Sequence, residues 1–306
     1  MKKTLIAVAA AALSMGAMAQ NVTLSGKFAV GYGKSIGGQS NLGVTDGDVR
    51  FTASEDLGGG MKASTSMEVR VRGRGAGVVD GRNATIGLSG GFGSITLGAV
   101  ESGNGIIGLG FAGAPVALHT GYDGAILSGA ANVDWFNYTS PALVPGLTAK
   151  FERVDSIGGP TLGATKGVSA NVLGGNYSAG AIAAAVDYSD FSNGRTRVRL
   201  SGSYNLGIAT LGLGWEDNKK TANSNGTQTA FGVTVPLGAV TAGLIYARNQ
   251  ETGLGAAGQV GTSQGWGIGM NYALSKRTAV NASYGDRTRG VAGDGAQYRL
   301  RVMHSF

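Results

Sequence analysis

The chain has 306 residues and a formal net charge of +7, and 56 residues are glycine whereas only 14% are charged. Ordinary globular domains have about 7% glycine and about 25% charged residues, and the absence of cysteine excludes disulfide scaffolds and thiolate metal sites. The glycines follow no three-residue period and the basic residues form no run longer than a pair, which excludes a collagen and disfavours nucleic acid as a partner.

The first nineteen residues have the pattern of a secretory signal peptide. Lys2 and Lys3 precede an apolar run over residues 5–13, and Ala17 and Ala19 then place small residues at the spacing that a signal peptidase needs. The apolar run is too short to cross a hydrocarbon core of about 30 Å as a helix. We therefore predict a cleaved signal peptide at 1–19 and a mature domain at 20–306, whose formal charge is lower by two.

The mature chain consists of short segments in which apolar and polar residues alternate. A period of two is typical of β-strands, whose successive side chains point to opposite faces. Segments of about ten such residues, separated by turn residues, are typical of strands that cross an outer membrane. The first segment shows the pattern with one apolar face: Val22, Leu24, Phe28, Val30 and Tyr32.

About sixteen such segments follow one another, up to an aromatic carboxyl terminus at Phe306. In the last segment, Tyr298, Leu300 and Val302 alternate with Arg299 and Arg301, which suits lipid on one side and water on the other. An unpaired terminal strand would be prone to aggregation, and pairing with the first strand removes that edge. The sequence therefore predicts an all-β fold, a closed transmembrane antiparallel β-barrel of about 16 strands, wide enough for an aqueous channel.

Alternation fails over residues 100–133, where glycine, alanine and isoleucine predominate. A stretch this long without regular structure is usually functional. The two acidic residues of this stretch are Glu101 and Asp123. Set against arginines of the wall, they would produce a transverse electric field across the lumen.

Several segments resemble the Gram-negative general porins of the β-proteobacterial trimeric type. This resemblance implies a sixteen-stranded barrel, a homotrimer, and a constriction loop at 100–133 that folds into the lumen. It also implies that Phe306 is part of the signal read by the barrel-insertion machinery. The matching segments are short and are spread over the mature chain: 22–26, 54–63, 85–89, 93–98, 272–278 and 304–306.

Two positions depart from the pattern of that family. Ala99 follows Gly98 where a basic residue is usual, and Met303 precedes His304 where arginine is usual. The arrangement of charge at the constriction is therefore expected to differ from that of the relatives, and selectivity has to be argued from this chain.

Arg195, Arg197 and Arg199 share one face of a predicted strand, at a spacing of roughly 7 Å. On the lipid face each of these arginines would cost about 2–4 kcal/mol. We therefore expect the three side chains to form a row of cations that faces the lumen. Rings of cations select anions. The acids predicted to face inward are fewer, namely Glu68, Glu152, Asp187 and Glu216. An alternative is that these charges only solvate the lumen and pair across strands. The same parity assigns further cations to the pore lining: Arg50, Lys62, Arg70, Arg72, Lys150, Arg299 and Arg301.

Enzymatic functions are disfavoured. Two glycine-rich matches to a dinucleotide motif, at 103–108 and 108–113, neither follow a strand nor open a helix. The two histidines, His119 and His304, have no evident catalytic partner. We predict no catalytic residue, no cofactor and no metal site.

The sequence thus predicts an outer-membrane general diffusion porin, surrounded by lipid, that passes small hydrophilic solutes and favours anions weakly. A structural or adhesive outer-membrane barrel with a closed pore is the alternative, and an autotransporter translocator is disfavoured because no passenger region precedes Val22.

Overall fold

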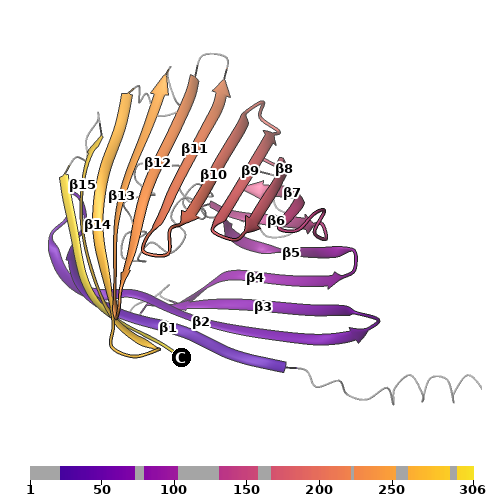
Figure 1. The fold of residues 1–306 in the computed structure, drawn as a ribbon, viewed down its shortest axis with the longest axis horizontal. Helices are drawn as coiled ribbons and strands as arrows, with labels where there is room; N and C mark the ends of the chain where they lie inside the picture. Colours follow the sequence, from indigo (N-terminus) through magenta and orange to yellow (C-terminus); the bar gives the residue numbers. More distant parts are fainter. Residues whose placement is uncertain are drawn as a thin grey trace, which may run out of the picture.

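A computed structural model describes residues 21–72, 79–102, 131–157, 167–221, 224–252, 261–289 and 295–306. These residues form sixteen strands that close into one antiparallel barrel. Each strand pairs with its neighbours in the sequence, and β1 pairs with β16 to complete the ring (Figure 1). The predicted all-β barrel and its strand number are confirmed.

The strands have the following bounds. The first half of the barrel comprises β1 Asn21–Lys34, β2 Ser40–Gly58, β3 Met61–Val71, β4 Val79–Gly90, β5 Gly93–Ser102, β6 Ala131–Thr139, β7 Leu147–Ile157 and β8 Ala170–Ala179. The second half comprises β9 Ile182–Phe191, β10 Thr196–Asn205, β11 Thr210–Thr221, β12 Ser224–Leu237, β13 Val240–Thr252, β14 Gly261–Ala273, β15 Thr278–Arg289 and β16 Gly295–Ser305.

The outer face of the barrel is apolar. Leu24, Leu213 and Leu300 are 57%, 63% and 54% exposed, which is the reverse of a soluble core. Aromatic side chains belong to the same outer set, and Trp266 packs against Tyr284 with ring centroids 5.8 Å apart. An apolar outer band that includes exposed aromatic residues fits a barrel that is surrounded by lipid.

One end of the barrel has short connections. Four hairpins, β2–β3, β4–β5, β8–β9 and β12–β13, are each joined by two residues. Gly59 and Gly60 make the first of these turns with φ of 61° and 78°, a region that glycine enters without a steric cost. Bacterial barrels have short turns on the periplasmic side, so we assign this end to the periplasm.

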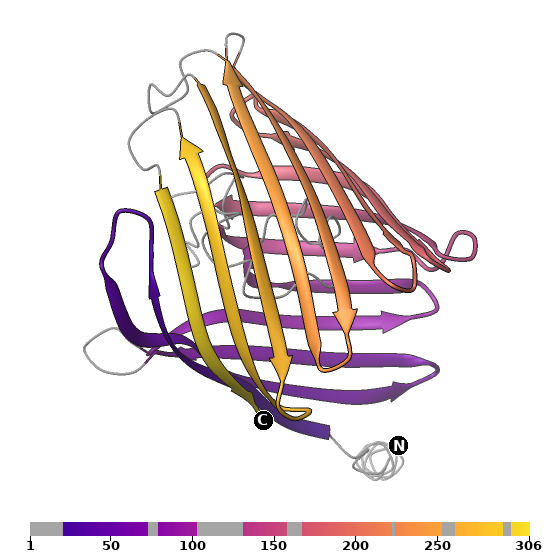
Figure 2. The ribbon, with the colours of Figure 1, turned by 60° about the vertical axis from the view of Figure 1, so that its left-hand side comes forward.

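The barrel closes where the two ends of the described chain meet. Val30 of β1 lies opposite Val302 of β16, and Gly26 exchanges two backbone hydrogen bonds of 3.0 Å with Phe306. A Cβ added at Gly26 would lie 2.5 Å from the Phe306 ring, so the glycine makes room for the terminal aromatic side chain. Figure 2 shows the carboxyl-terminal strand beside the indigo first strand at this seam.

The structure corrects the bounds of the predicted constriction loop. β5 continues through Val100 and Glu101 to Ser102, and β6 begins at Ala131, so both ends of the 100–133 range belong to strands. These two strands pair with each other, and Val100 of β5 lies opposite Val133 of β6. Glu101 is therefore a strand residue, whereas Asp123 and residues 103–130 lie outside the described residues.

No helix in the described part of the chain is long and apolar enough to cross a membrane. Among the same residues, no group of three or more His, Asp or Glu side chains is arranged to hold a metal ion.

Candidate functional site

The strand register shows which side chains share the inner face of the barrel. Residues that lie opposite each other on paired strands project to the same side. Leu200 is exposed to the outside, whereas Arg199 is 8% exposed on the opposite face of β10. Arg199 lies opposite Asp187 of β9 and Glu216 of β11, so all three face inward.

A belt of alternating charge follows this register across the inner wall from β7 to β11. Lys150 Nζ lies 2.8 Å from Asp187 Oδ1 and 3.3 Å from Glu152 Oε1. The contact between Lys150 and Asp187 passes over β8 at Gly174, where an added Cβ would lie 2.7 Å from Lys150 Cε. A larger residue at Gly174 would therefore separate this ion pair.

The belt continues in a buried ion pair between β10 and β11. Arg199 donates from Nε and Nη2 to Glu216 Oε2 at 2.9 and 2.6 Å. Glu216 is fully buried, and its carboxylate neutralises the charge of Arg199 at these short distances. Arg199 thus holds the wall together and contributes little field to a passing solute.

Arg195 and Arg197 differ from Arg199 because neither makes an ion pair within the described part of the chain. Their guanidinium carbons lie 3.9 and 5.4 Å from the centroid of the Phe191 ring, a cation–π geometry that holds both side chains in place. Arg197 Nη2 donates to Ser189 Oγ at 3.2 Å. The two cations are only partly buried, and they are the members of the predicted row whose charge is left for a solute.

Burial lowers the pKa of the Arg195 guanidinium below its ordinary value. Glu216 opposes this change and the positive charge of Arg199 adds to it. An arginine remains charged at neutral pH despite such a shift, so two neighbouring cations persist at this position. An anion would relieve their mutual repulsion.

The opposite wall, formed by β1 to β5, carries a second set of charges in which cations and carboxylates are mutually paired. Glu68 accepts from Arg50 at 2.6 Å, from Arg82 at 3.1 Å and from Asn83 at 3.2 Å. Glu68 is 5% exposed, and three donors compensate for its burial.

Arg82 joins three carboxylates of that wall. It lies 3.2 Å from Asp48 and 2.6 Å from Glu101, in addition to its contact with Glu68. Arg70 also lies 3.3 Å from Glu101. Glu101, predicted as a constriction-loop acid, is thus engaged by two wall arginines from its place on β5.

The other predicted pore-lining cations occupy different levels of the barrel. Lys62 is exposed opposite Asp56 near the periplasmic end, and Arg72 is exposed just after β3. Arg301 is 1% exposed and is paired with Asp46, while Arg299 is half-buried one step along β16.

Several charged residues of the inner wall are missing from the predicted pore lining, among them Lys27, Asp46, Asp48 and Arg82. Lys27, Asp46 and Asp48 extend the inward faces of β1 and β2, and Lys27 Nζ lies 3.3 Å from Asp46 and 3.4 Å from Asp48. Strict alternation from Arg50 back along the strand could have found the two aspartates. Arg82 could not have been found in this way, because the β3–β4 register shifts between Met67 and Val69, and an extra residue there changes the face.

Comparison with known proteins gives a family match over most of the chain. The family model described as Gram-negative porin matches residues 5–290. The Neisseria meningitidis serogroup B major outer membrane protein P.IB is 36% identical over 116 residues, which are 33% of this chain and 34% of that protein. Outer membrane porin protein 32 of Delftia acidovorans is 39% identical over 110 residues, 32% of this chain and 31% of the relative. These alignments therefore span about a third of each curated relative.

Solved structures match the whole barrel at lower sequence identity. The anion-selective porin from Comamonas acidovorans superposes with a TM-score of 0.67 at 21% identity and covers 94% of this chain and 100% of its own. The trimer form of OmpT from Vibrio cholerae gives a TM-score of 0.70 at 13% identity, covering 94% and 100%. At these identities the superpositions establish the common fold.

Proposed function

The chain belongs to the Gram-negative porin family, and from this membership we propose that it is a general diffusion porin of the outer membrane, favouring anions weakly. Its relatives are outer-membrane proteins and porins, which are channels rather than enzymes. Small hydrophilic solutes and ions would cross the lumen down their gradients, with no covalent step and no cofactor. Size and wall charge would set their rates.

The observation that carries the anion preference is the pair Arg195 and Arg197. Other inward cations of the described residues lie beside carboxylates, as Arg50, Lys150 and Arg199 do. Arg195 and Arg197 instead stack on Phe191 and make no ion pair among the described residues. Cations arranged in this way favour anions in a water-filled passage. The superposed Comamonas barrel, named as anion-selective, is consistent with this proposal.

The remaining expectations for the protein belong to the same proposal. Residues 1–19 would be removed on export, and three copies would assemble in the outer membrane, as the trimeric Vibrio barrel does. Phe306 would be read by the barrel-insertion machinery, and its place at the seam is compatible with that role. The segment carrying Asp123 would narrow the lumen.

Uptake into proteoliposomes tests the diffusion pore directly. Liposomes that contain the purified, folded protein are expected to swell quickly in arabinose and more slowly in disaccharides and trisaccharides. A lumen of fixed width admits small sugars faster than large ones. Protein-free liposomes and liposomes with heat-unfolded protein are the controls. Folded protein that gives no swelling in any sugar would contradict the proposal and favour a structural or adhesive barrel with a closed pore.

A further inference from the structure

The turn between β14 and β15, residues 274–277, differs from the other turns at the periplasmic end of the barrel. Seven turns connect strands there, all within the described residues, and only this one contains charged side chains. They belong to Lys276 and Arg277, which are both exposed and make no ion pair among the described residues. The acids close to that end, Glu55 and Asp56, lie on β2, three strands from β15 around the ring. Residues 274–277, which we call the basic turn, thus present two uncompensated positive charges.

Hydrogen bonds fix the backbone of the basic turn. Ser275 Oγ accepts from the backbone N–H of Arg277 at 3.2 Å and from that of Thr278 at 3.0 Å. The backbone N–H groups of Leu274 and Ser275 both donate to Thr278 O, at 2.9 and 3.1 Å. The backbone N–H of Ser305 on β16 donates to Arg277 O at 2.8 Å. The turn is therefore held beside the carboxyl end of the chain, where Figure 2 shows it.

A polar contact on the outer face marks the level at which the hydrocarbon ends. Leu300 and Val302 on β16 are more than half exposed, as contact with lipid requires. The next outward residue is His304, and its Nδ1 lies 2.9 Å from Thr278 Oγ1 on β15. Imidazole and hydroxyl groups are costly in hydrocarbon, so this pair belongs at the membrane interface. Thr278 directly follows the basic turn, which consequently lies at the level of the lipid headgroups.

An apolar groove opens on the outer face of the neighbouring strands. It has a volume of about 540 Å³ and is lined by residues of β12 to β15, among them the exposed side chains of Ile268 and Met270. Ala242 and Ala282 lie on either side of Met270 in the register, and their short side chains leave the surface hollow. Ala282 is four residues from Thr278, which is about 13 Å along a strand. The groove is therefore within reach of a lipid whose headgroup lies at the basic turn.

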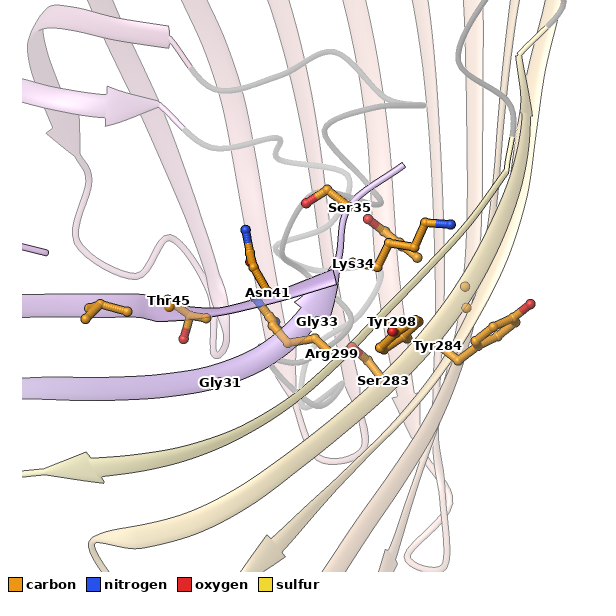
Figure 3. Close-up of a pocket in the computed structure, with 15 residues that line it drawn as sticks. Gly31, Gly33, Lys34, Ser35, Asn41, Thr45, Ser283, Tyr284, Tyr298 and Arg299 are labelled. Carbon is orange, nitrogen blue, oxygen red and sulfur yellow. The ribbon is translucent and has the colours of Figure 1, made fainter. Parts of the chain in front are cut away.

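The inner side of the same strands confirms which way the groove faces. A polar recess of about 250 Å³ around Arg299 lies on the inner wall and is formed by β1, β2 and β14 to β16. Figure 3 shows Ser283 beside this recess and the ring of Tyr284 projecting from the opposite side of β15. Tyr284 also lines the apolar groove, and Ala282 has the same parity along the strand. The groove thus faces the lipid.

We propose that the basic turn and the apolar groove together bind a phospholipid with an anionic headgroup, such as phosphatidylglycerol, in the periplasmic leaflet of the outer membrane. Lys276 and Arg277 bind the phosphate through charge-assisted hydrogen bonds, and an acyl chain lies along Val280 and Ala282 in the groove. Charge complementarity selects this occupant, because cations beside an apolar face fit a molecule that combines an anion with hydrocarbon. The site lies outside the solute pathway and does not depend on an open pore.

Native mass spectrometry of the folded protein in detergent measures the lipid preference. The protein is titrated with phosphatidylglycerol and with phosphatidylethanolamine of the same acyl chains. Phosphatidylglycerol is expected to bind with an apparent Kd at least fivefold lower, because the ammonium group of the other lipid would lie beside two cations. Glycerol phosphate, which has the anion but no acyl chain, is expected not to bind at equal concentration. Equal binding of the two lipids, or binding of glycerol phosphate as strong as that of the lipid, would overturn the proposal.

Two variants test the turn and the groove separately. Lys276→Gln with Arg277→Gln is expected to raise the apparent Kd for phosphatidylglycerol at least fivefold and to leave that for phosphatidylethanolamine unchanged. Ala282→Leu fills the groove without changing any charge, and it is expected to weaken the binding of both lipids. Gel electrophoresis without heating verifies that each variant is folded.

Lys62→Gln with Arg72→Gln is the matched control, because it removes two exposed cations that lie on or next to β3, away from the groove. Phosphatidylglycerol binding is expected to be unchanged in this control. Unchanged binding in Lys276→Gln with Arg277→Gln would overturn the lipid site and leave the basic turn to an acidic partner in the periplasm. If Ala282→Leu dissociates the oligomer but binds both lipids normally, the groove belongs to a second copy of the chain and the proposal is also overturned.

Discussion

Arg301→Met is expected to lower the unfolding temperature of the barrel more than any other single change of a lumen charge. Arg301 is 1% exposed, donates from Nε to Asn281 at 2.9 Å and pairs with Asp46. It reaches from β16 over Gly31 of β1 to β2, so this contact spans the closing seam. Its loss would leave Asp46 buried with Lys27 as its remaining cation. Breaking a buried pair in this way costs about 3–5 kcal/mol.

The shift of the folded form to the unfolded form on gel electrophoresis, after heating in detergent, measures this effect. The double variant Arg301→Met with Asp46→Ala is the control, because it removes both charges and is expected to recover a large part of the lost stability. An unfolding temperature of Arg301→Met equal to that of the unmodified barrel would contradict a seam held by this pair. A double variant less stable than the single one would contradict it as well.

Neutralising Arg195 and Arg197 together, as Arg195→Gln with Arg197→Gln, is expected to reduce the ratio of chloride to potassium permeability by about twofold, towards one. Both cations lack an ion pair among the described residues and share the Phe191 ring. Their charge therefore acts on the solution in the lumen. Neither holds two strands together through a carboxylate, so the barrel is expected to fold normally. The reversal potential in a KCl gradient measures the ratio.

The matched control removes the same charge elsewhere. Lys62 and Arg72 are exposed at the two ends of β3, where salt screens them within about 10 Å at 0.1 M. Lys62→Gln with Arg72→Gln is expected to change the permeability ratio by less than half as much. Equal shifts in the two double variants would mean that net charge alone sets the preference, and that the unpaired arginines have no special role.

The barrel itself could be predicted from the sequence because strand alternation has a strict period of two. Segments such as 297–306 showed one apolar and one polar face, and the structure places Tyr298, Leu300 and Val302 on the exposed outer face. Strand number and closure followed from the repeat of such segments. The ends of strands were predicted less accurately. β5 extends to Ser102 and β6 begins at Ala131, both inside the range predicted as a loop.

Pairing between charges could not be predicted, since it depends on register and on bulges. Arg199 and Arg197 look equivalent in the sequence, yet Arg199 lies opposite Glu216 whereas Arg197 lies opposite Asn218. Arg82 reaches Glu68 and Glu101 only because the strand pairing shifts beside it. The recess around Arg299 is lined by glycines of four strands, and no local pattern indicates that these glycines meet: Gly31, Gly33, Gly43, Gly267 and Gly285.

The reversal potential of the unmodified, unheated protein in a planar bilayer under a KCl gradient shows whether the open pore favours chloride over potassium. We expect stable conductance in steps of three, as a trimer would give, with a reversal potential of the sign that chloride preference requires. A reversal potential of the opposite sign would contradict an anion-favouring pore.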